Sequence, residues 1–492
     1  MAQRIIPDLE TFTRHAERHG VVPITVTVVA DRETPVTIYE KLVGAETGFL
    51  LESAEGGEEW GRWSFLGWDP HFTLLSRDER SWIDGADIEV PPGDALEVLE
   101  ALVERYSAPD WPGLPPLHSG AVGALAYDAV RLVEHLPNQP PDDRGLPTSL
   151  WMFVGALAAF DRRTQSVTLI RNVFVEDGDP KAQYDDAVIK LERDIERLGG
   201  SQAYTVHQPV EASMPDISGL NASMSKDAYM DAVRIAKSHI LAGDVFQVVP
   251  SLRLEMPFTA DPFAVYRHQR LLNPSPFLYF VHHEAMSIVG ASPEIMSRVR
   301  DGIVYSRPIA GTRPRGASSD EDQRLEAELL ADPKERAEHV MLVDLARNDL
   351  GRVCEYGSVE VDDLMVVERY SHVMHIVSGV SGKLTPGKSA VEVLRATFPH
   401  GTVSGAPKVR AMEIIDDIEP VARGPYAGAV GYIDFTGSMD TAIALRTVVI
   451  GDNKAWVQAG AGIVADSDPA LEYQECLNKA AAALSAVRAA SE

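Results

Sequence analysis

The chain has 492 residues, of which 45% are apolar and 24% are charged. This composition predicts a globular protein and excludes disordered and fibrous classes. The formal charge of −28 argues against a nucleic-acid partner, because phosphate binding needs clustered lysine and arginine. The first thirty residues or so contain no long apolar run, so they predict neither a secretory signal nor a membrane span, and we expect a cytoplasmic protein.

The first part of the chain contains two amphipathic helical patterns. The first covers 94–105, with Leu96, Leu99 and Val103 at helical spacing, and the second covers 181–198. Two glycines at 199–200 end the second helix. Residues 201–224 mix Ser, Gln, Pro and Gly without periodicity and predict a linker. We therefore divide the chain into an N-terminal region 1–200, a linker 201–224 and a second region 225–492.

The second region alternates helical and strand patterns. Ser225 is a good N-cap for a helix that ends at Gly243, and Val245 to Val249 reads as a strand. Residues 427–449 predict a hairpin that turns near Gly437, and 454–458 predict another strand. These patterns indicate an α+β layered sandwich with mostly antiparallel sheets and flanking helices, rather than a doubly wound sheet.

Two predicted helices each present a pair of glutamates. The first starts at residues 332–335, where Asp is the N-cap, Pro the first helical residue and Glu the end of a capping box. The second starts in the same way at residues 468–469. Residues three apart share one helix face, and the glutamates paired in this way are Glu335 with Glu338, and Glu472 with Glu475.

These glutamates have two interpretations. Acidic residues at helix N-termini are often exposed and simply stabilise the helix. Glu338 and Glu475, however, adjoin the apolar runs 340–343 and 480–484, which predicts buried helices whose carboxylates need a cation. No His or Cys has ligand spacing, and His339 has the wrong offset from Glu335 for a di-iron centre. An all-oxygen site favours Mg²⁺.

A glycine-rich run and one arginine are candidates for anion binding. Residues 458–463, Gln-Ala-Gly-Ala-Gly-Ile, lie between a predicted strand and the helix that starts near Pro469. Small residues let backbone amides approach a carboxylate closely, although a tight turn explains the same glycines equally well. Arg446, placed on the predicted hairpin, is suited to bind a carboxylate with two hydrogen bonds. An exposed strand arginine is the simpler interpretation.

Several ordered motifs give this chain a resemblance to a known family. Together they are similar to the chorismate-utilising enzymes, and most closely to anthranilate synthase component I. The motifs that carry the resemblance, which covers most of the chain, are 290–294 (GASPE), 307–313 (RPIAGTR), 335–349, 401–408 (GTVSGAPK), 458–463 and 474–479 (QECLNK).

The resemblance implies a magnesium-dependent carbon–oxygen lyase that converts chorismate and ammonia to anthranilate and pyruvate, the first step of tryptophan biosynthesis. In this family the Mg²⁺ ligands correspond to Glu338 and Glu475, with Glu335 and Glu472 nearby. Glu294 corresponds to the general acid for the departing C4 hydroxyl. His375 corresponds to the residue that supports loss of pyruvate, although alone it reads as a packed strand histidine.

Further residues acquire roles only through the resemblance. Thr402 belongs with the catalytic residues and lines the substrate ring. The residues implied to bind the ring, the enolpyruvyl group and the carboxylates are Gly311, Thr312, Tyr426, Arg446, Gly460, Ala461, Gly462 and Lys479.

Two positions distinguish reactions within the family. Members that add water have a lysine where this chain has Gln247, and aminodeoxychorismate synthases have a lysine where it has Ala310. Both differences favour direct amination by ammonia. His400 stands where many relatives have alanine, and its role is open. The alternatives are a synthase that stops at the aminated intermediate, an aminodeoxychorismate synthase, or a silent tryptophan-binding regulator that would be expected to lose its carboxylates.

The N-terminal region resembles the regulatory part of the family. The implied tryptophan feedback site contains Ser53, Pro276, Phe277 and Leu278, although residues 50–53 also read as an ordinary half-buried strand. The chain has no glutaminase-like Cys and His arrangement. We therefore expect a separate glutamine amidotransferase subunit, anthranilate synthase component II, to supply ammonia within a heterotetramer.

Overall fold

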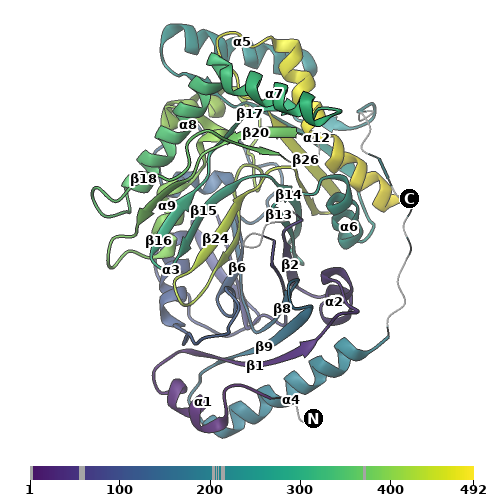
Figure 1. The fold of residues 1–492 in the computed structure, drawn as a ribbon, viewed down its shortest axis with the longest axis vertical. Helices are drawn as coiled ribbons and strands as arrows, with labels where there is room; N and C mark the ends of the chain where they lie inside the picture. Colours follow the sequence, from purple (N-terminus) through teal and green to yellow (C-terminus); the bar gives the residue numbers. More distant parts are fainter. Residues whose placement is uncertain are drawn as a thin grey trace.

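Two large antiparallel sheets form the centre of the molecule in the computed structural model (Figure 1). The structure describes residues 4–54, 61–201, 206, 208, 210–211, 217–369 and 373–492. Helices cover the outer faces of both sheets, which confirms the predicted α+β layered sandwich. No helix in these described ranges has the length and apolarity needed to span a membrane.

The larger sheet contains eleven strands drawn from both ends of the chain. Their order across the sheet is β1 (Val21–Val29), β9 (Ser166–Phe174), β8 (Ala156–Asp161), β3 (Trp63–Trp68), β2 (Gly48–Glu52), β13 (Phe277–His283), β14 (Met286–Ser292), β25 (Thr447–Gly451), β26 (Lys454–Gly460), β12 (Ser251–Pro257) and β10 (Asn221–Ala222).

The second sheet contains ten strands, which also come from both ends of the chain. Their order is β18 (Glu360–Val361), β21 (Val380–Lys383), β16 (Ile303–Ser306), β15 (Ile295–Arg300), β24 (Met439–Ile443), β23 (Ala429–Ile433), β6 (Ala121–Leu125), β7 (Ser149–Phe153), β4 (Phe72–Arg77) and β5 (Arg80–Asp84). Two small sheets complete the strands, namely β17 (Ile309–Pro314), β20 (Val373–Val377) and β19 (Val366–Arg369), and the pair β11 (Gln247–Val248) and β22 (Gly405–Ala406).

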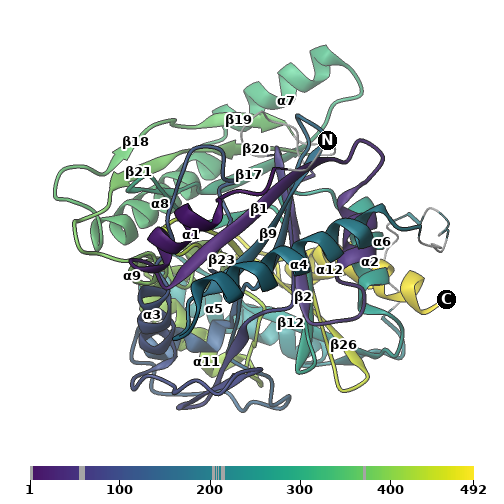
Figure 2. The ribbon, with the colours of Figure 1, turned by 90° about the horizontal axis from the view of Figure 1, so that it is seen from below.

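Twelve α-helices and one 3₁₀ helix occur in the described part of the chain. They are α1 (Leu9–Ala16), α2 (Pro35–Leu42), α3 (Ala95–Arg105), η1 (Tyr127–Leu132), α4 (Pro180–Gly199), α5 (Lys226–Ala242), α6 (Pro262–Leu272), α7 (Ser319–Ala331), α8 (Pro333–Gly351), α9 (Ala390–Thr397), α10 (Gly401–Ser404), α11 (Lys408–Ile418) and α12 (Pro469–Ser491). Helix α4 packs on β9 and β1 (Figure 2), at the lower end of the molecule in Figure 1.

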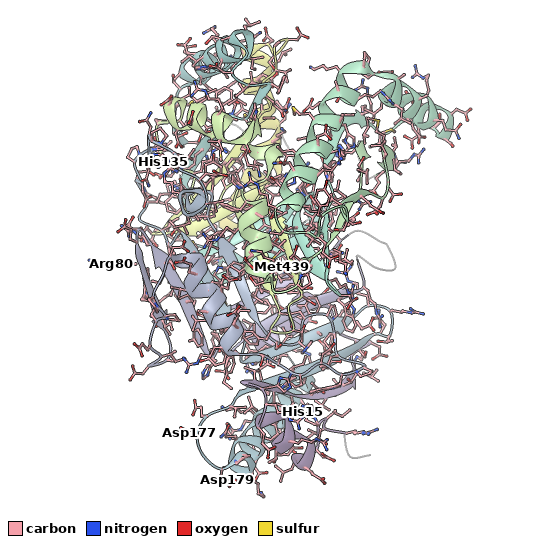
Figure 3. The ribbon with its side chains drawn as sticks, turned by 90° about the vertical axis from the view of Figure 1, so that its left-hand side faces the viewer. His15, Arg80, His135, Asp177, Asp179 and Met439 are labelled. Atoms are coloured by element: carbon pink, nitrogen blue, oxygen red, sulfur yellow. The ribbon has the colours of Figure 1, made fainter. Side chains whose placement is uncertain are left out.

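Each sheet is apolar on both faces, so one buried layer lies between the two sheets and another lies between each sheet and its helices. Phe49 and Phe65 from the larger sheet share one buried cluster with Leu150 and Val430 from the second. The outer face of the larger sheet packs on α2, α4, α5, α6 and α12, whereas the second sheet packs on α3, α8 and α9. Figure 3 places Met439 of β24 in the middle of the molecule, far from Asp177 and Asp179 near the start of α4.

The predicted helix boundaries agree closely with the structure. Helix α3 occupies Ala95–Arg105 with Asp94 as its N-cap, and α4 ends at Gly199. Helix α5 begins after Ser225, whose side chain accepts from the Ala228 amide, and ends at Gly243 in the left-handed conformation. These predictions are confirmed because caps and glycine stops are local signals.

Three local predictions were wrong in part. The strand expected at 245–249 shrinks to two residues, because β11 pairs only with the two-residue β22. The hairpin expected at 427–449 ends at residue 443, and residues 447–449 belong to β25 of the other sheet. At α8, Asp332 caps the helix as predicted, but the Glu335 side chain contacts Arg313 instead of completing a capping box.

The two regions proposed from the sequence share both sheets. Strand β2 pairs with β13, and β6 pairs with β23, so strands from before residue 200 and after residue 225 lie side by side. Much of the predicted linker, at 202–205, 207, 209 and 212–216, lies outside the described residues. Because strands of both regions pair within each sheet, the two regions form one continuous structure in the described residues.

Candidate functional site

A cavity of about 430 Å³ lies where α8, α12 and β17 approach the end of the larger sheet. It collects all the residues for which we predicted a role in catalysis, metal binding or substrate binding, with the exception of Ala461. Those residues are Glu294, Gly311, Thr312, Glu335, Glu338, His375, Thr402, Tyr426, Arg446, Gly460, Gly462, Glu472, Glu475 and Lys479.

Helix α8 presents Glu335 and Glu338 to the cavity. The helix starts there because Asp332 accepts hydrogen bonds from the Lys334 and Glu335 amides and Pro333 occupies the first turn. Glu338 Oε1 accepts from Gln247 Nε2 at 3.0 Å. Burial raises the pKa of Glu338, and the negative charges of Glu335 and Glu475 raise it further. Like charges facing one another in a cavity favour a bound cation.

Helix α12 supplies the other glutamate pair from the opposite side. Glu475 Oε1 lies 2.7 Å from Lys479 Nζ, and 48% of the Glu475 side chain is exposed. The expectation that Glu475 is buried was therefore wrong, since the apolar run at 480–484 packs on the next turn of the helix. Burial and the Glu475 charge raise the pKa of Glu472.

The carboxylates do not form a closed metal cage. Within the described ranges, no three Asp, Glu, His or Cys side chains lie close enough together to hold an ion by themselves. Two helices nevertheless direct four glutamates into one cavity, and oxygen donors of this kind suit Mg²⁺ that also binds a substrate. An ion held by few protein ligands keeps positions open for a carboxylate of the ligand.

Glu294 lies in the short link between β14 and β15. Its side chain is 5% exposed, and burial raises the pKa of its carboxyl to about 8. The Ile309 amide and the charge of Lys479 oppose this increase. Glu294 Oε1 has no hydrogen-bond partner among the described groups. A carboxyl with these surroundings is neutral near pH 7 and can donate a proton.

His375 lies on β20, opposite Thr312 of β17. Its Nδ1 is 2.9 Å from the Gly311 carbonyl oxygen and 3.1 Å from Thr312 Oγ1. A carbonyl oxygen can only accept, so Nδ1 carries the proton and Nε2 carries the lone pair. Burial lowers the pKa of His375. A neutral imidazole held in one tautomer is a suitable general base.

Arg446 occupies a crossing point between the two sheets. The chain leaves β24 at Ile443 and enters β25 at Thr447, and Arg446 has a φ of 49° in this link. Its Nη1 donates to Asn273 Oδ1 at 3.0 Å. Arg446 is therefore part of a sheet-to-sheet link, not of a hairpin strand, and this turn directs it into the cavity.

The glycine-rich run is split between the cavity and the fold. Gly460 ends β26, and a side chain there would lie 2.7 Å from the Pro250 carbonyl oxygen. The Ala461 amide donates to that same carbonyl at 3.2 Å, and Ala461 is fully buried outside the cavity lining. Gly462 lines the cavity beside Gln247. The run allows close approach at Gly460 and Gly462, but not at Ala461.

Some lining residues were not singled out from the sequence. Lys334 and Ser467 line the cavity, and Ser467 hydrogen-bonds to Glu472. Asn273 stands outside the lining and contacts it through Arg446. Lys334 could have been found from its place beside Glu335 at the helix start, whereas Ser467 and Asn273 depend on contacts made by the fold.

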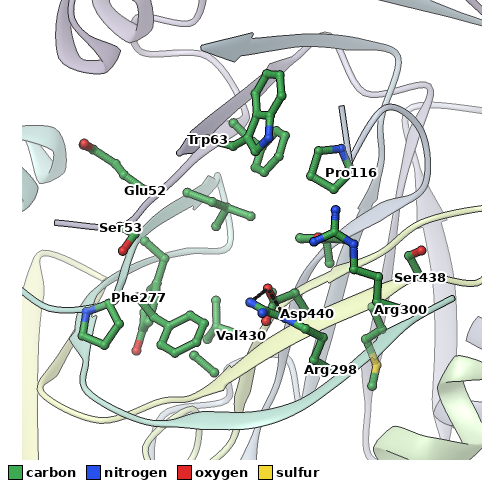
Figure 4. A pocket seen from close by; sticks show the side chains of 18 of the residues that line it. Glu52, Ser53, Trp63, Pro116, Phe277, Arg298, Arg300, Val430, Ser438 and Asp440 are labelled. Carbon is green, nitrogen blue, oxygen red and sulfur yellow. Dashed lines mark hydrogen bonds and ion pairs between the residues drawn. The ribbon is translucent and has the colours of Figure 1, made fainter. Parts of the chain in front are cut away.

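A second cavity, of about 560 Å³, lies between the two sheets (Figure 4). Ser53, Pro276, Phe277 and Leu278 all line it. The buried Ser53 hydroxyl has no hydrogen-bond partner among the described residues, so a ligand could satisfy it.

Several charged groups around the second cavity are paired. Glu52 accepts from Tyr266 at 2.6 Å, from Arg270 at 2.9 Å and from Arg162 at 2.9 Å. Arg298 bonds to Asp440 across β15 and β24, and Figure 4 shows both side chains on one wall. Glu52 and Arg298 are therefore neutralised by their partners, and the lining also contains apolar side chains such as Phe277 and Leu278.

The profile of chorismate binding enzymes matches residues 47–485, which is most of the chain. The chain belongs to this family. Anthranilate synthase component 1 of Acetivibrio thermocellus is 43% identical over 99% of this chain and 99% of that protein. The protein of the same name from Pseudomonas aeruginosa is 46% identical over 98% of this chain and 99% of that protein.

Solved structures agree with this assignment. Anthranilate synthase component I from Streptococcus pneumoniae superposes with a TM-score of 0.77 at 35% identity, covering 93% of this chain and 99% of that chain. The menaquinone-specific isochorismate synthase from Escherichia coli reaches a TM-score of 0.72 at 19% identity and shares the fold. Within the chorismate-binding family, the chain groups with anthranilate synthase component I.

Proposed function

We propose that this chain is the large subunit of an anthranilate synthase, and that it converts chorismate and ammonia to anthranilate, pyruvate and water. The observation that carries this proposal is the single cavity that joins a neutral acid, Glu294, a neutral base, His375, and four glutamates. Relatives named anthranilate synthase component 1, aligned over nearly the whole chain, support the same activity.

The first step requires an acid at C4 and a nucleophile at C2. Glu294 donates its proton to the C4 hydroxyl, which leaves as water while ammonia bonds to C2 and the ring double bonds shift. Burial keeps the Glu294 carboxyl neutral before this transfer. Lys479, whose charge acts on Glu294, stabilises the carboxylate that remains.

Ammonia is the nucleophile that the cavity accommodates best. Gln247 lines the cavity, donates to Glu338 and leaves its own buried Oε1 without a partner in the described chain. An amide oxygen can accept a hydrogen bond from ammonia but cannot deprotonate water at neutral pH. Ala310 also lines the cavity and offers no amine to form a covalent intermediate.

The second step removes pyruvate and makes the ring aromatic. His375 Nε2 takes the proton from C2, and the electron pair forms the ring double bond as the enolpyruvyl group leaves C3. The Gly311 carbonyl holds the imidazole in the required tautomer through Nδ1. Arg446 is placed to bind a substrate carboxylate and keep C2 facing the base.

We infer that Mg²⁺ binds at Glu338 and Glu475, with Glu335 and Glu472 beside it. Burial and neighbouring carboxylates raise the pKa values of Glu338 and Glu472. Carboxylates in these surroundings are stabilised by a bound cation, which supports the proposed metal site. When bound, Mg²⁺ neutralises a carboxylate of chorismate and helps to orient it. Glu475 would exchange its contact with Lys479 for the metal.

A partner amidotransferase, component II, is proposed as the source of ammonia. A groove of about 850 Å³ lies beside the catalytic cavity and shares Gln247, Lys334 and Glu338 with it. Its wall is largely apolar, and Phe246 is 70% exposed there. A docked subunit would cover this surface and release ammonia next to Gln247, and we expect two copies of each subunit in the complex.

Tryptophan is proposed as a feedback inhibitor that binds the second cavity. An amino acid with an apolar ring suits walls that combine Phe277, Leu278 and Pro276 with the unsatisfied Ser53 hydroxyl. Because this cavity is lined by different residues from the catalytic one, inhibition would act through the fold and not by competition for the same groups.

One assay tests the proposed reaction. The purified chain is mixed with chorismate, Mg²⁺ and an ammonium salt at mildly alkaline pH, and anthranilate is followed by its fluorescence. We expect turnover without glutamine or a partner. Folded protein that consumes no chorismate would contradict the proposal, and accumulation of an aminated, pyruvate-bearing product would identify a synthase that stops after the first step.

A further inference from the structure

His400 lies directly behind the acid of the catalytic cavity. It is the N-cap of α10, and its side chain is 5% exposed. Its Nδ1 lies 2.9 Å from Thr402 Oγ1, 3.4 Å from the Thr402 amide nitrogen and 3.6 Å from Glu294 Oε1. The imidazole does not line the cavity, so it acts on the substrate only through its neighbours.

The hydrogen bonds fix the tautomer of His400. An amide N–H can only donate, so the Thr402 amide requires a lone pair on Nδ1. Burial and the nearby charge of Lys408 lower the pKa of His400 to about 3, so the ring is neutral. A neutral ring with a lone pair on Nδ1 carries its single proton on Nε2.

This tautomer determines the direction of the next hydrogen bond. Nδ1 can only accept, so the Thr402 hydroxyl donates its one proton to His400. With its proton already used, the hydroxyl cannot donate to the nearby Glu294 carboxylate. Glu294 Oε1 lies 3.6 Å from the Nδ1 of His400, which presents a lone pair, and it has no hydrogen-bond partner among the described groups. A carboxyl that faces a lone pair and receives no proton from Thr402 is favoured in its neutral acid form.

We propose that His400 is a positioning residue, which acts through the Thr402 hydroxyl to keep Glu294 in its proton-donating form. This inference rests on the proposed function of Glu294 as the acid of the first step. The role of His400 depends on the hydrogen bond that it accepts from the Thr402 hydroxyl, and not on its packing. No proton leaves His400 during turnover, and its contribution is to engage the Thr402 hydroxyl proton, so that Thr402 does not donate to the Glu294 carboxylate.

The other groups that face Glu294 work against this effect. Lys479 from α12 attracts a negative charge, and the Ile309 amide from β17 donates to the carboxyl. If His400 were absent, Thr402 could also donate to the carboxylate, and three groups would then favour ionisation. Lys408 from α11 acts on His400 itself and helps to keep the ring neutral.

The test compares His400→Ala with His400→Asn in the ammonia-dependent reaction. The rate of the first step needs protonated Glu294, so it falls as pH rises through the pKa of that carboxyl. His400→Ala should move this fall to lower pH by about one unit, which is about tenfold in rate on the alkaline side. Asn has an acceptor oxygen that can replace Nδ1, so His400→Asn should return the profile toward that of the parent.

The measurement is kcat and KM for chorismate across pH, with free ammonia held constant. His283→Asn is a matched control, because His283 is equally buried but bonds to Asp84 in another part of the fold. We expect KM to change less than about twofold in the His400 variants and the His283→Asn profile to match the parent. Equal profiles for the parent and His400→Ala would overturn the proposal, as would equal losses in both His400 variants.

A second readout does not depend on turnover. Infrared difference spectra of the whole chain can detect the protonated carboxyl of Glu294, identified by its absence in Glu294→Gln. This band should disappear at lower pH in His400→Ala than in the parent and in His400→Asn. An unchanged titration would contradict the role of His400 even if the enzyme proved inactive, whereas a shifted titration in an inactive enzyme would challenge only the proposed function.

Discussion

The two cavities use their charged side chains in opposite ways. The catalytic cavity is lined only by residues after 246. Burial and neighbouring carboxylates raise the pKa values of Glu338 and Glu472, while Glu335 contacts Arg313 and Glu475 contacts Lys479. The second cavity is lined by strands from both regions, and two of its charged side chains are held in ion pairs, Glu52 with Arg270 and Arg298 with Asp440. This difference agrees with the proposal that the first cavity binds an ion and an anionic substrate and the second a small amphipathic molecule.

The comparison also shows how closely the cavities are connected. Phe277 of the second cavity pairs with Ser292, two residues before Glu294. Asn273, at the end of α6, accepts from Arg446 of the catalytic cavity, and its chain continues directly into Pro276 and Phe277. A ligand that displaces this short segment would alter both the acid and the substrate-binding arginine.

The largest expected effect comes from removing a charge of the catalytic cavity. Glu475→Gln should lower turnover by at least about 100-fold, since a lost ligand charge leaves the substrate carboxylate poorly neutralised. Activity is measured against Mg²⁺ concentration, and circular dichroism checks the fold, because Gln is almost as good a helix former as Glu. Glu192→Gln, on the exposed face of α4, is the control. Near-parental activity would mean that the metal binds elsewhere.

His375→Met should separate the two chemical steps. We expect a loss of about 10²–10⁴ in the second step, the usual contribution of a positioned base, while chorismate is still consumed. Chromatography of the reaction mixture should reveal an aminated intermediate that retains the enolpyruvyl group. If chorismate consumption and anthranilate formation fell together without this intermediate, His375 would have a binding or packing role.

Asn273→Ala tests the connection between the cavities. Loss of the acceptor for Arg446 should raise KM for chorismate about fivefold with a smaller change in kcat, because a hydrogen bond to a charged group contributes about 1 kcal/mol when partly exposed. The same variant should weaken inhibition by tryptophan. Asn138→Ala, on the surface, is the control. An unchanged KM together with unchanged inhibition would show that the contact carries no coupling.

The smallest effect on the uninhibited rate is expected at Ser53. Ser53→Phe fills the second cavity and should raise the tryptophan concentration for half inhibition by at least about tenfold, with the uninhibited rate within about twofold of the parent. Ser53→Ala removes only the hydroxyl and should give a weaker version of the same change. Full sensitivity in the Phe variant would place the effector elsewhere.

The sequence predicted the helices, and the set of residues that line the first cavity, better than the connections between strands. Capping residues such as Ser225 and Asp332 specify helix ends locally, and the carboxylate pairs follow from helical spacing. The pairing of β2 with β13 joins residues more than 200 positions apart, and no local pattern encodes it. For the same reason the position of Arg446 was misjudged, because its turn depends on two sheets and not on its neighbours in sequence.

The side chains that complete the cavities were also harder to predict. The exposure of Glu475 could not be read from the apolar run that follows it, since adjacent turns of one helix can face different surroundings. His400 was visible only as an unusual residue before Gly401. Its meaning depends on Thr402 and Glu294, which lie together only in the folded chain.

The exchange of strands between the two regions also affects synthesis of the chain. When the first 200 residues have left the ribosome, β2 and β6 are apolar strands whose outer edges still lack their partners, β13 and β23. At about 5–20 residues per second, roughly 12 to 47 seconds pass before the partner of β6 is made. The nascent half is therefore prone to aggregation during this interval, and we expect its yield to depend on chaperones that shield exposed strand edges.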